Sequence, residues 1–200
     1  MRDLSIAEEA RRFLAEFIGT FALVFAGCGA IVIDTLSHGQ LTHVGVAISF
    51  GLVIAVMIYA IGHISGAHMN PAVTLAFALA RHFPFVRIPL YWTAQLLGAA
   101  AAALVLRLFC GNVAHLGTTL PSGSDGQSFG LEIVLTSFLM LVIMAVATDH
   151  RAVGQAAAIA IGGTVLLDAM FGGPISGASM NLARSFGPAL ISGTWQHFWV

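Results

Sequence analysis

The chain has 200 residues, of which 58% are hydrophobic and only 8% are charged, and its formal net charge at pH 7 is −1. Soluble domains carry about 25% charged residues, so this chain has too few charges to cover a globular surface in water. The near-neutral charge argues against a nucleic-acid partner, and the cysteines and histidines show no zinc-binding spacing. We expect an integral membrane protein without a cofactor or bound metal.

Nearly uncharged stretches are long enough to cross a bilayer, which takes about 20 residues per helix. The stretches are Phe13–Ile33, Val44–Gly62, Ile88–Leu106, Leu131–Ala147 and Ala152–Phe171. The first is too long for a cleaved signal peptide, and it contains Glu16. The sequence therefore predicts an all-α, multi-pass membrane protein with five full spans.

The distribution of arginine predicts the orientation in the membrane. On one side we expect the ends that carry Arg2, Arg11, Arg12, Arg81, Arg87 and Arg151. The loops expected on the other side, residues 34–43 and 109–128, contain no arginine. Because arginine-rich ends stay in the cytoplasm, we expect a cytoplasmic N-terminus, and we place the protein in the plasma (inner) membrane.

The strongest pattern is an internal repeat. Ser65–Ala72 recurs as Ser176–Ala183, and the pair Glu16 and Thr20 recurs, with the same spacing, later in the chain. An odd number of spans separates the two copies, so the second copy enters the membrane from the opposite face. We divide the chain into a first repeat (1–109), an extracellular connecting loop (110–128) and a second repeat (129–200).

Each copy of the motif predicts a loop followed by a short helix. Asn70 is a favourable N-cap and Pro71 suits the first helical position, so we expect a half-helix over 70–79 and its counterpart over 181–190. Ten residues span about 15 Å, which is half a bilayer. The two helix N-termini are expected to meet in mid-membrane, where Asn70 and Asn181 can donate amide hydrogens to a solute.

Backbone that leaves the helix inside a membrane must face protein or water. We expect a pore lined by the carbonyl oxygens of Gly66, Ala67, His68, Gly177, Ala178 and Ser179. Glu16 and Glu132 lie within spans and need partners, and the N–H groups of the two loops can supply them. The alternative is that each glutamate forms hydrogen bonds only within its own bundle.

The two motifs resemble the paired signature loops of the aquaporin (major intrinsic protein) family, and the likeness covers nearly the whole chain. The runs His63–His68 and Gly173–Asn181 are most similar to the nodulin-like branch, whose members pass glycerol and uncharged metalloid hydroxides. The resemblance implies an hourglass pore in each subunit of a homotetramer. It places the selectivity constriction at Phe50, Ala169, Ala178 and Arg184.

These features predict a passive channel and no enzyme. We expect it to pass water, glycerol and metalloid hydroxides such as arsenous or boric acid, because two alanines stand where water-selective members have a histidine and a larger polar residue. The positive helix N-termini and Arg184 are expected to exclude protons and other ions. The alternatives are a water-selective aquaporin, a secondary transporter and a non-conducting truncated subunit.

Three features depart from the pattern or stay open. Leu182 stands where the family usually has proline, and we expect it to change the magnitude of conduction but not its kind. Asp168 either biases the vestibule toward hydrogen-bonding solutes or binds serine, threonine or backbone groups in the outer bundle. The counterpart of Ile88–Leu106 would begin around Trp199, where the sequence stops. We expect a truncated sixth span, and the alternative is a five-span protein with a deficient wall.

Overall fold

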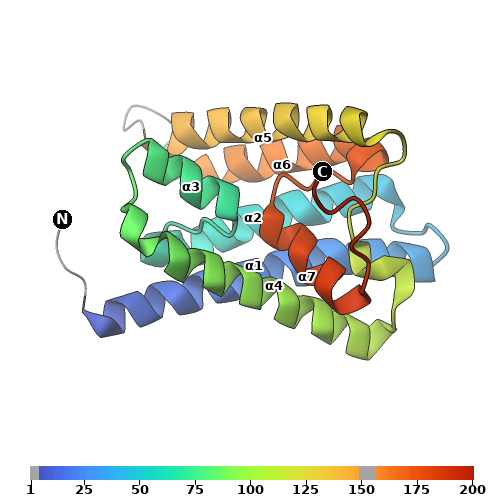
Figure 1. The fold of residues 1–200 in the computed structure, drawn as a ribbon, viewed down its shortest axis with the longest axis horizontal. Helices are drawn as coiled ribbons and strands as arrows, with labels where there is room; N and C mark the ends of the chain where they lie inside the picture. Colours follow the sequence, from blue (N-terminus) through green and yellow to red (C-terminus); the bar gives the residue numbers. More distant parts are fainter. Residues whose placement is uncertain (1–4, 149–155) are drawn as a thin grey trace.

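The structure is a computed structural model that describes residues 5–148 and 156–200. Within these ranges the regular secondary structure is helical, and five helices are long and apolar enough to cross a membrane. The long helices are α1 (Ile6–Leu36), α2 (Thr42–Ser65), α4 (Ile88–Cys110), α5 (Asp125–Thr148) and α6 (Ala157–Ser176). The short ones are α3 (Pro71–Leu79), α7 (Leu182–Ser192), η1 (Phe85–Arg87) and η2 (Val113–Gly117) (Figure 1).

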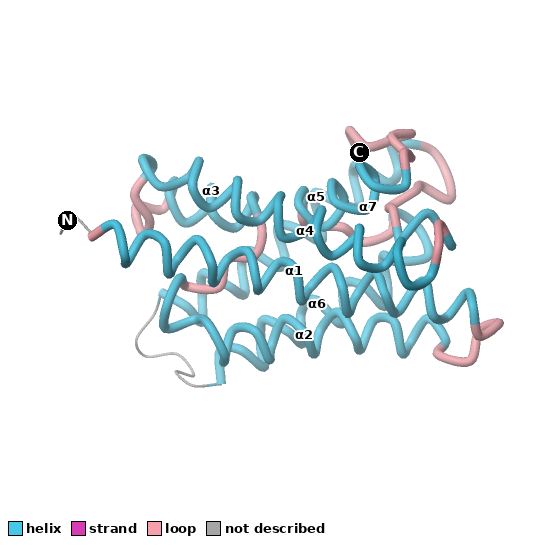
Figure 2. Tube along the Cα trace, turned by 90° about the horizontal axis from the view of Figure 1, so that it is seen from below, coloured by secondary structure: helices cyan, strands magenta, loops and turns pink. Residues whose placement is uncertain are grey.

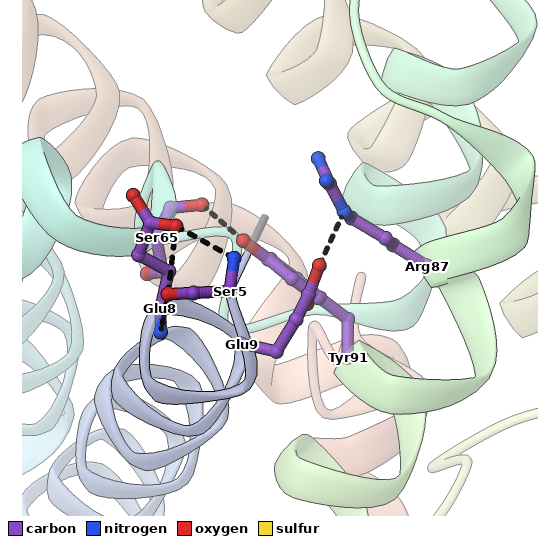
Figure 3. A network of polar contacts seen from close by, with 6 residues as sticks. All are labelled: Ser5, Glu8, Glu9, Ser65, Arg87 and Tyr91. Atoms are coloured by element: carbon purple, nitrogen blue, oxygen red, sulfur yellow. Dashed lines mark hydrogen bonds and ion pairs between the residues drawn. The ribbon is translucent and has the colours of Figure 1, made fainter. Parts of the chain in front are cut away.

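Helix α1 begins earlier than the predicted Phe13 because its first turn is capped. The backbone N–H and the hydroxyl of Ser5 donate to Glu8 Oε2 at 2.8 and 2.9 Å, and Glu8 N donates back to Ser5 Oγ at 3.3 Å. Arg87 Nε donates to Glu9 Oε1 at 2.7 Å, which ties the start of α1 to the start of α4 (Figure 3). The capping box therefore extends the helix beyond its purely apolar part.

Two other boundaries differ from the sequence prediction. Helix α5 begins at Asp125, inside the expected connecting loop, because Ser124 Oγ accepts a hydrogen bond from Gln127 N at 3.2 Å in its first turn. Helix α6 begins at Ala157, and the predicted residues 152–155 of this span lie outside the described residues, as do Arg2 and Arg151.

The long helices pack through glycines at close crossings. Helix α1 contacts α2 and α4, while α6 contacts α2 and α5. At the α2–α6 crossing, a Cβ on Gly51 would lie 2.6 Å from the carbonyl oxygen of Gly162, and a Cβ on Gly162 would lie 2.5 Å from that of Gly51. A larger residue at either position would push the helices apart, as is typical of small-residue packing in membranes.

The short helices α3 and α7 occupy opposite halves of the bundle, and both begin near its middle (Figures 1 and 2). Asn70 and Asn181 are their N-cap residues and lie just outside the helices. Asn70 Oδ1 accepts from Ala72 N at 2.9 Å, and Asn181 Oδ1 accepts from Ala183 N at 3.0 Å. Helix α7 extends to Ser192, and turns follow at Gly193 and at residues 196–199.

Candidate functional site

The two loops that precede α3 and α7 have the same backbone conformation. Gly66, Ala67 and Met69 have φ angles of 89°, 49° and 52°, and their counterparts in the second loop have 89°, 44° and 50°. Residues other than glycine adopt this left-handed region at a cost, so the surroundings must hold both loops in place. The repeated motif therefore produces the same strained turn twice.

Glu16 supplies hydrogen-bond acceptors to the first loop. Its Oε1 accepts from Ser65 Oγ at 2.7 Å and from His68 N at 2.9 Å. Its Oε2 accepts from Met69 N at 2.7 Å and from Gln95 Nε2 at 2.8 Å. The glutamate side chain is fully buried, and these four donors compensate for its loss of water.

Glu132 makes the equivalent contacts with the second loop. Its Oε1 accepts from Ser176 Oγ at 2.6 Å and from Ser179 N at 2.9 Å, and its Oε2 accepts from Met180 N at 2.8 Å. Glu132 is only half-buried, and it lines a groove between α5 and α7. The two glutamates therefore hold corresponding atoms of the two loops, but in unequal environments.

The loop tips are joined by a reciprocal pair of hydrogen bonds. Asn70 Nδ2 donates to the carbonyl oxygen of Met180 at 2.7 Å, and Asn181 Nδ2 donates to that of Met69 at 2.8 Å. An amide nitrogen carries two hydrogens, so each asparagine keeps one N–H that is not used in this tie. Both asparagines line a cavity beside the loops, called the inner cavity below, where two helix N-termini add about half a positive charge each.

Two cavities lie on either side of these loops. The inner cavity follows Gly66–His68, Ala178 and Ser179 between apolar side chains of α2, α5 and α6. The outer cavity is bounded by the ends of α1 and α2 and by residues 117–120, and Gly177 lines this cavity rather than the inner one. The residues common to both linings are Phe50, Ala169, Ala178 and Arg184. The two cavities therefore adjoin at these four residues.

Arg184 is held at this junction and is only 2% exposed. Its Nη1 donates to the carbonyl oxygen of Gly117 at 2.7 Å, and its guanidinium carbon lies 5.0 Å from the centroid of the Phe50 ring. This distance permits a cation–π interaction. Within the described residues Arg184 Nε is buried without a hydrogen-bond partner. The remaining walls are the small side chains of Ala169 and Ala178.

The backbone of the loops offers acceptors along the cavities. In the part of the chain that the structure describes, the carbonyl oxygens of residues 66–68 and 177–179 accept no hydrogen bond from the protein, whereas those of Met69 and Met180 bind the two asparagines. Buried carbonyl groups normally have partners. Free carbonyls beside a cavity can therefore bind a polar solute.

Sequence reasoning missed two polar residues of α4 that support the first loop. Gln95 is fully buried and also donates to Thr74 Oγ1 at 3.1 Å. Tyr91 donates its hydroxyl hydrogen to the carbonyl oxygen of Ser65 at 2.7 Å (Figure 3). The available signal was a glutamine in an apolar span, because polar side chains there face the interior of the bundle.

Two residues that sequence reasoning marked lie away from the junction. Leu182 is 48% exposed and lines the groove between α5 and α7, not the inner or outer cavity. Asp168 is 4% exposed and lines neither cavity, and its Oδ2 has no hydrogen-bond partner among the described residues.

Comparison with known proteins agrees with this geometry. The sequence profile of the family described as Major intrinsic protein matches residues 3–200. Aquaporin NIP1-1 from Oryza sativa subsp. japonica is 56% identical over 191 residues, which are 95% of this chain and 67% of that protein. Nodulin-26 from Glycine max is 49% identical over 191 residues, which are 95% of this chain and 70% of that protein.

A solved structure shares the fold. The aquaglyceroporin from Plasmodium falciparum matches with a TM-score of 0.86 and 27% sequence identity, over 96% of this chain and 88% of that one. These matches extend over almost the whole length of the chain and include both loops and both cavities. The protein is therefore a multi-pass membrane channel, not an enzyme, and it belongs to the major intrinsic protein family.

Proposed function

We propose that the channel passively conducts water, glycerol and uncharged metalloid hydroxides such as arsenous and boric acid, and that it excludes protons and other ions. The observation that carries the proposal is the junction of the two cavities at Phe50, Ala169, Ala178 and Arg184. These residues would form the selectivity constriction. The names of the relatives, aquaporins and an aquaglyceroporin, support the same class of solute.

Size selection would follow from the two alanines. Ala169 and Ala178 contribute one methyl group each, so the passage beside Arg184 is wider than it would be with a histidine or another large side chain. The Phe50 ring supplies an apolar wall, while the guanidinium of Arg184 and the loop carbonyls supply polar groups. A solute such as glycerol has both a carbon face and hydroxyl groups, and this lining can accommodate both.

Ion exclusion would follow from the charges along the path. Among the described residues that line the inner cavity there is no aspartate or glutamate, and Arg184 is the charged group. Two helix N-termini, with about half a positive charge each, face the same region. Asp34 lines the outer cavity, where its Oδ1 accepts a hydrogen bond from Thr42 N at 2.7 Å. In the inner cavity a cation would lose water without gaining a negative partner, whereas a neutral solute exchanges hydrogen bonds with Asn70, Asn181 and the carbonyls.

The same distribution argues against a proton-coupled transporter. Such a carrier needs a titratable group that solute or protons can reach at the midplane. Glu16 is fully buried and already accepts four hydrogen bonds from the protein. Glu132 likewise accepts three hydrogen bonds from the protein, and it lines the groove between α5 and α7 rather than either cavity. His68 lines the inner cavity, but its Nδ1 lies 3.1 Å from Thr74 Oγ1 and its ring stacks on Phe77. Asn70 and Asn181, which line the same cavity, do not titrate.

We also propose that the N-terminus faces the cytoplasm of a plasma membrane and that four copies assemble. The start of α1, the end of α3 and the start of α4 lie toward the same end of the bundle (Figure 1). These segments carry Arg11, Arg12, Arg81 and Arg87. Arginines concentrate on the cytoplasmic side. The homotetramer rests on the family resemblance, and cross-linking in native membranes would test it.

Stopped-flow light scattering on proteoliposomes tests the proposed solutes. We expect water, glycerol and arsenous acid to enter faster than into protein-free liposomes, with fluxes linear in concentration and independent of a proton gradient. Entry of water alone would instead indicate a water-selective channel. Saturating, gradient-dependent flux would indicate a transporter, and no flux for any solute would indicate a non-conducting subunit.

A further inference from the structure

We propose that Leu116 is a positioning residue for Arg184 and thereby sets the solute selectivity of the constriction. It would do so through a left-handed turn, defined here as residues 114–117, which lies in the connection between α4 and α5. This inference rests on the proposed channel function. It concerns a segment for which sequence analysis assigned no role.

The turn has an unusual backbone. Ala114, His115 and Leu116 have φ angles of 48°, 48° and 58° with ψ angles of 34°, 33° and 27°, and Gly117 follows with φ 77°. Residues with a side chain rarely occupy this region, and consecutive ones do so less often still. A run of this kind persists only where its surroundings hold it, and such strain gathers at functional sites.

Leu116 is the anchor of the turn. Its side chain is fully buried and belongs to the main hydrophobic core, as does Cys28 of α1. The next residue is packed equally closely, because a Cβ on Gly117 would lie 3.0 Å from Cβ and 3.2 Å from Cα of Cys28. The turn is therefore seated on α1 and cannot move toward it.

The seated turn presents one acceptor to the constriction. The carbonyl oxygen of Gly117 receives the hydrogen bond from Arg184 Nη1 at 2.7 Å. Within the described residues this is the one hydrogen bond that the structure gives the guanidinium, and Nε is buried without a partner. The position of the Gly117 carbonyl therefore decides where the guanidinium lies beside Phe50.

The flanks of the turn also hold the far end of the helix that carries Arg184. His115 Nδ1 lies 3.1 Å from Thr194 Oγ1, and Asn112 Nδ2 donates to the carbonyl oxygen of Ser192 at 3.4 Å. These partners lie at the C-terminal end of α7, whereas Arg184 is in its first turn. The segment 112–118 thus contacts both ends of α7 and fixes the helix relative to the constriction.

Loss of the anchor should reorient Arg184 rather than remove it. If the Gly117 carbonyl moves, the guanidinium loses its partner, and its flexible stem can swing toward the space beside Ala169 and Ala178. That movement would obstruct glycerol more than water, because glycerol is larger. We expect Leu116→Ala to lower the ratio of glycerol to water permeability by about tenfold, as for other changes in pocket size.

The experiment compares three variants in proteoliposomes by stopped-flow light scattering. Leu106→Ala is the matched control, since Leu106 is 4% exposed in the same core but lines neither cavity. Both alanine variants should unfold at a lower temperature, but only Leu116→Ala should change the permeability ratio. Leu116→Met, which nearly conserves the side-chain volume, should keep the glycerol-to-water permeability ratio of the unsubstituted protein.

Each measured permeability ratio either supports or overturns the role of Leu116. An unchanged ratio in a folded Leu116→Ala channel, or the same fall in Leu106→Ala, would overturn the role of Leu116. If Leu116→Ala does not fold, Leu116→Val should lower the ratio in the same direction, and an unchanged ratio there would also overturn it. Absence of glycerol flux in the unsubstituted protein would instead contradict the proposed channel function.

Discussion

The side-chain amide of Asn181 donates a hydrogen bond to the carbonyl oxygen of Met69 at 2.8 Å, across 112 positions of the chain. The reciprocal bond runs from Asn70 to Met180 at 2.7 Å. Each asparagine therefore caps its own half-helix, holds the opposite loop and keeps one N–H at the inner cavity. Three tasks fall on one side chain, and substitutions can separate them.

Asn70→Ser should keep the helix cap but lose the contact with Met180, because serine can cap a helix but is too short to reach across. We expect destabilisation by about 1 kcal/mol for the lost hydrogen bond. Asn70→Ala should cost about 1 kcal/mol more, because the cap is lost as well. Thermal unfolding in detergent checks the order, and equal stability of Asn70→Ser and the unsubstituted protein would contradict the role of the tie.

Glu16→Gln should destabilise the protein more than Glu132→Gln. An amide replaces one acceptor oxygen with a donor, which leaves a buried N–H unpaired at a cost of about 1–3 kcal/mol. Glu16 is fully buried and has four donors, whereas Glu132 has three and is half-buried. Unfolding temperatures of the two variants measure the difference. A larger fall in unfolding temperature for Glu132→Gln would contradict this order. It would show that the hydrogen bonds beside the groove between α5 and α7 contribute more to stability than those of Glu16.

Arg184→Gln should admit cations while neutral solutes still pass. The substitution removes the full positive charge at the junction but leaves the two helix N-termini in place. Because a unit charge within a few ångströms changes the energy of an ion by several kcal/mol, we expect proton leak to rise about tenfold or more. A pH-sensitive dye inside proteoliposomes reports the leak. No increase would assign ion exclusion to the helix N-termini alone.

Leu182→Pro should leave selectivity unchanged. The Leu182 side chain lines the groove between α5 and α7 and neither the inner nor the outer cavity. Proline suits the first position of a helix, so α7 should persist. We expect total flux to change but the glycerol-to-water ratio and the proton leak to stay the same. A change in either quantity would show that Leu182 acts on the pore.

The elements of the fold were predictable because each has a local cause. The five spans follow from the length of apolar stretches, and the half-helices follow from an asparagine cap before a short apolar run. The start of α1 was placed too late because its first turns are charged, although Ser5 and Glu8 have the spacing of a capping box. Helix boundaries that polar caps set can thus be predicted from the sequence, but hydropathy alone does not predict them.

The environment of the constriction was less predictable. Arg184 binds a backbone carbonyl, and a backbone acceptor leaves no mark in the sequence. The left-handed turn that presents this carbonyl contains Ala114, His115 and Leu116, and alanine and leucine rarely adopt that conformation. The tertiary packing of the Leu116 side chain stabilises this conformation of the turn. Long-range contacts of this kind depend on the assembled bundle and not on any nearby motif.

The permeability of proteoliposomes to water and glycerol, measured in parallel for the unsubstituted protein and for Ala169→His, tests the central claim most directly. The unsubstituted channel should pass both solutes. The histidine should fill the space beside Arg184, so that Ala169→His still passes water but loses most of its glycerol flux. Exclusion of glycerol by the unsubstituted protein, or equal glycerol flux in both proteins, would contradict a constriction at these four residues.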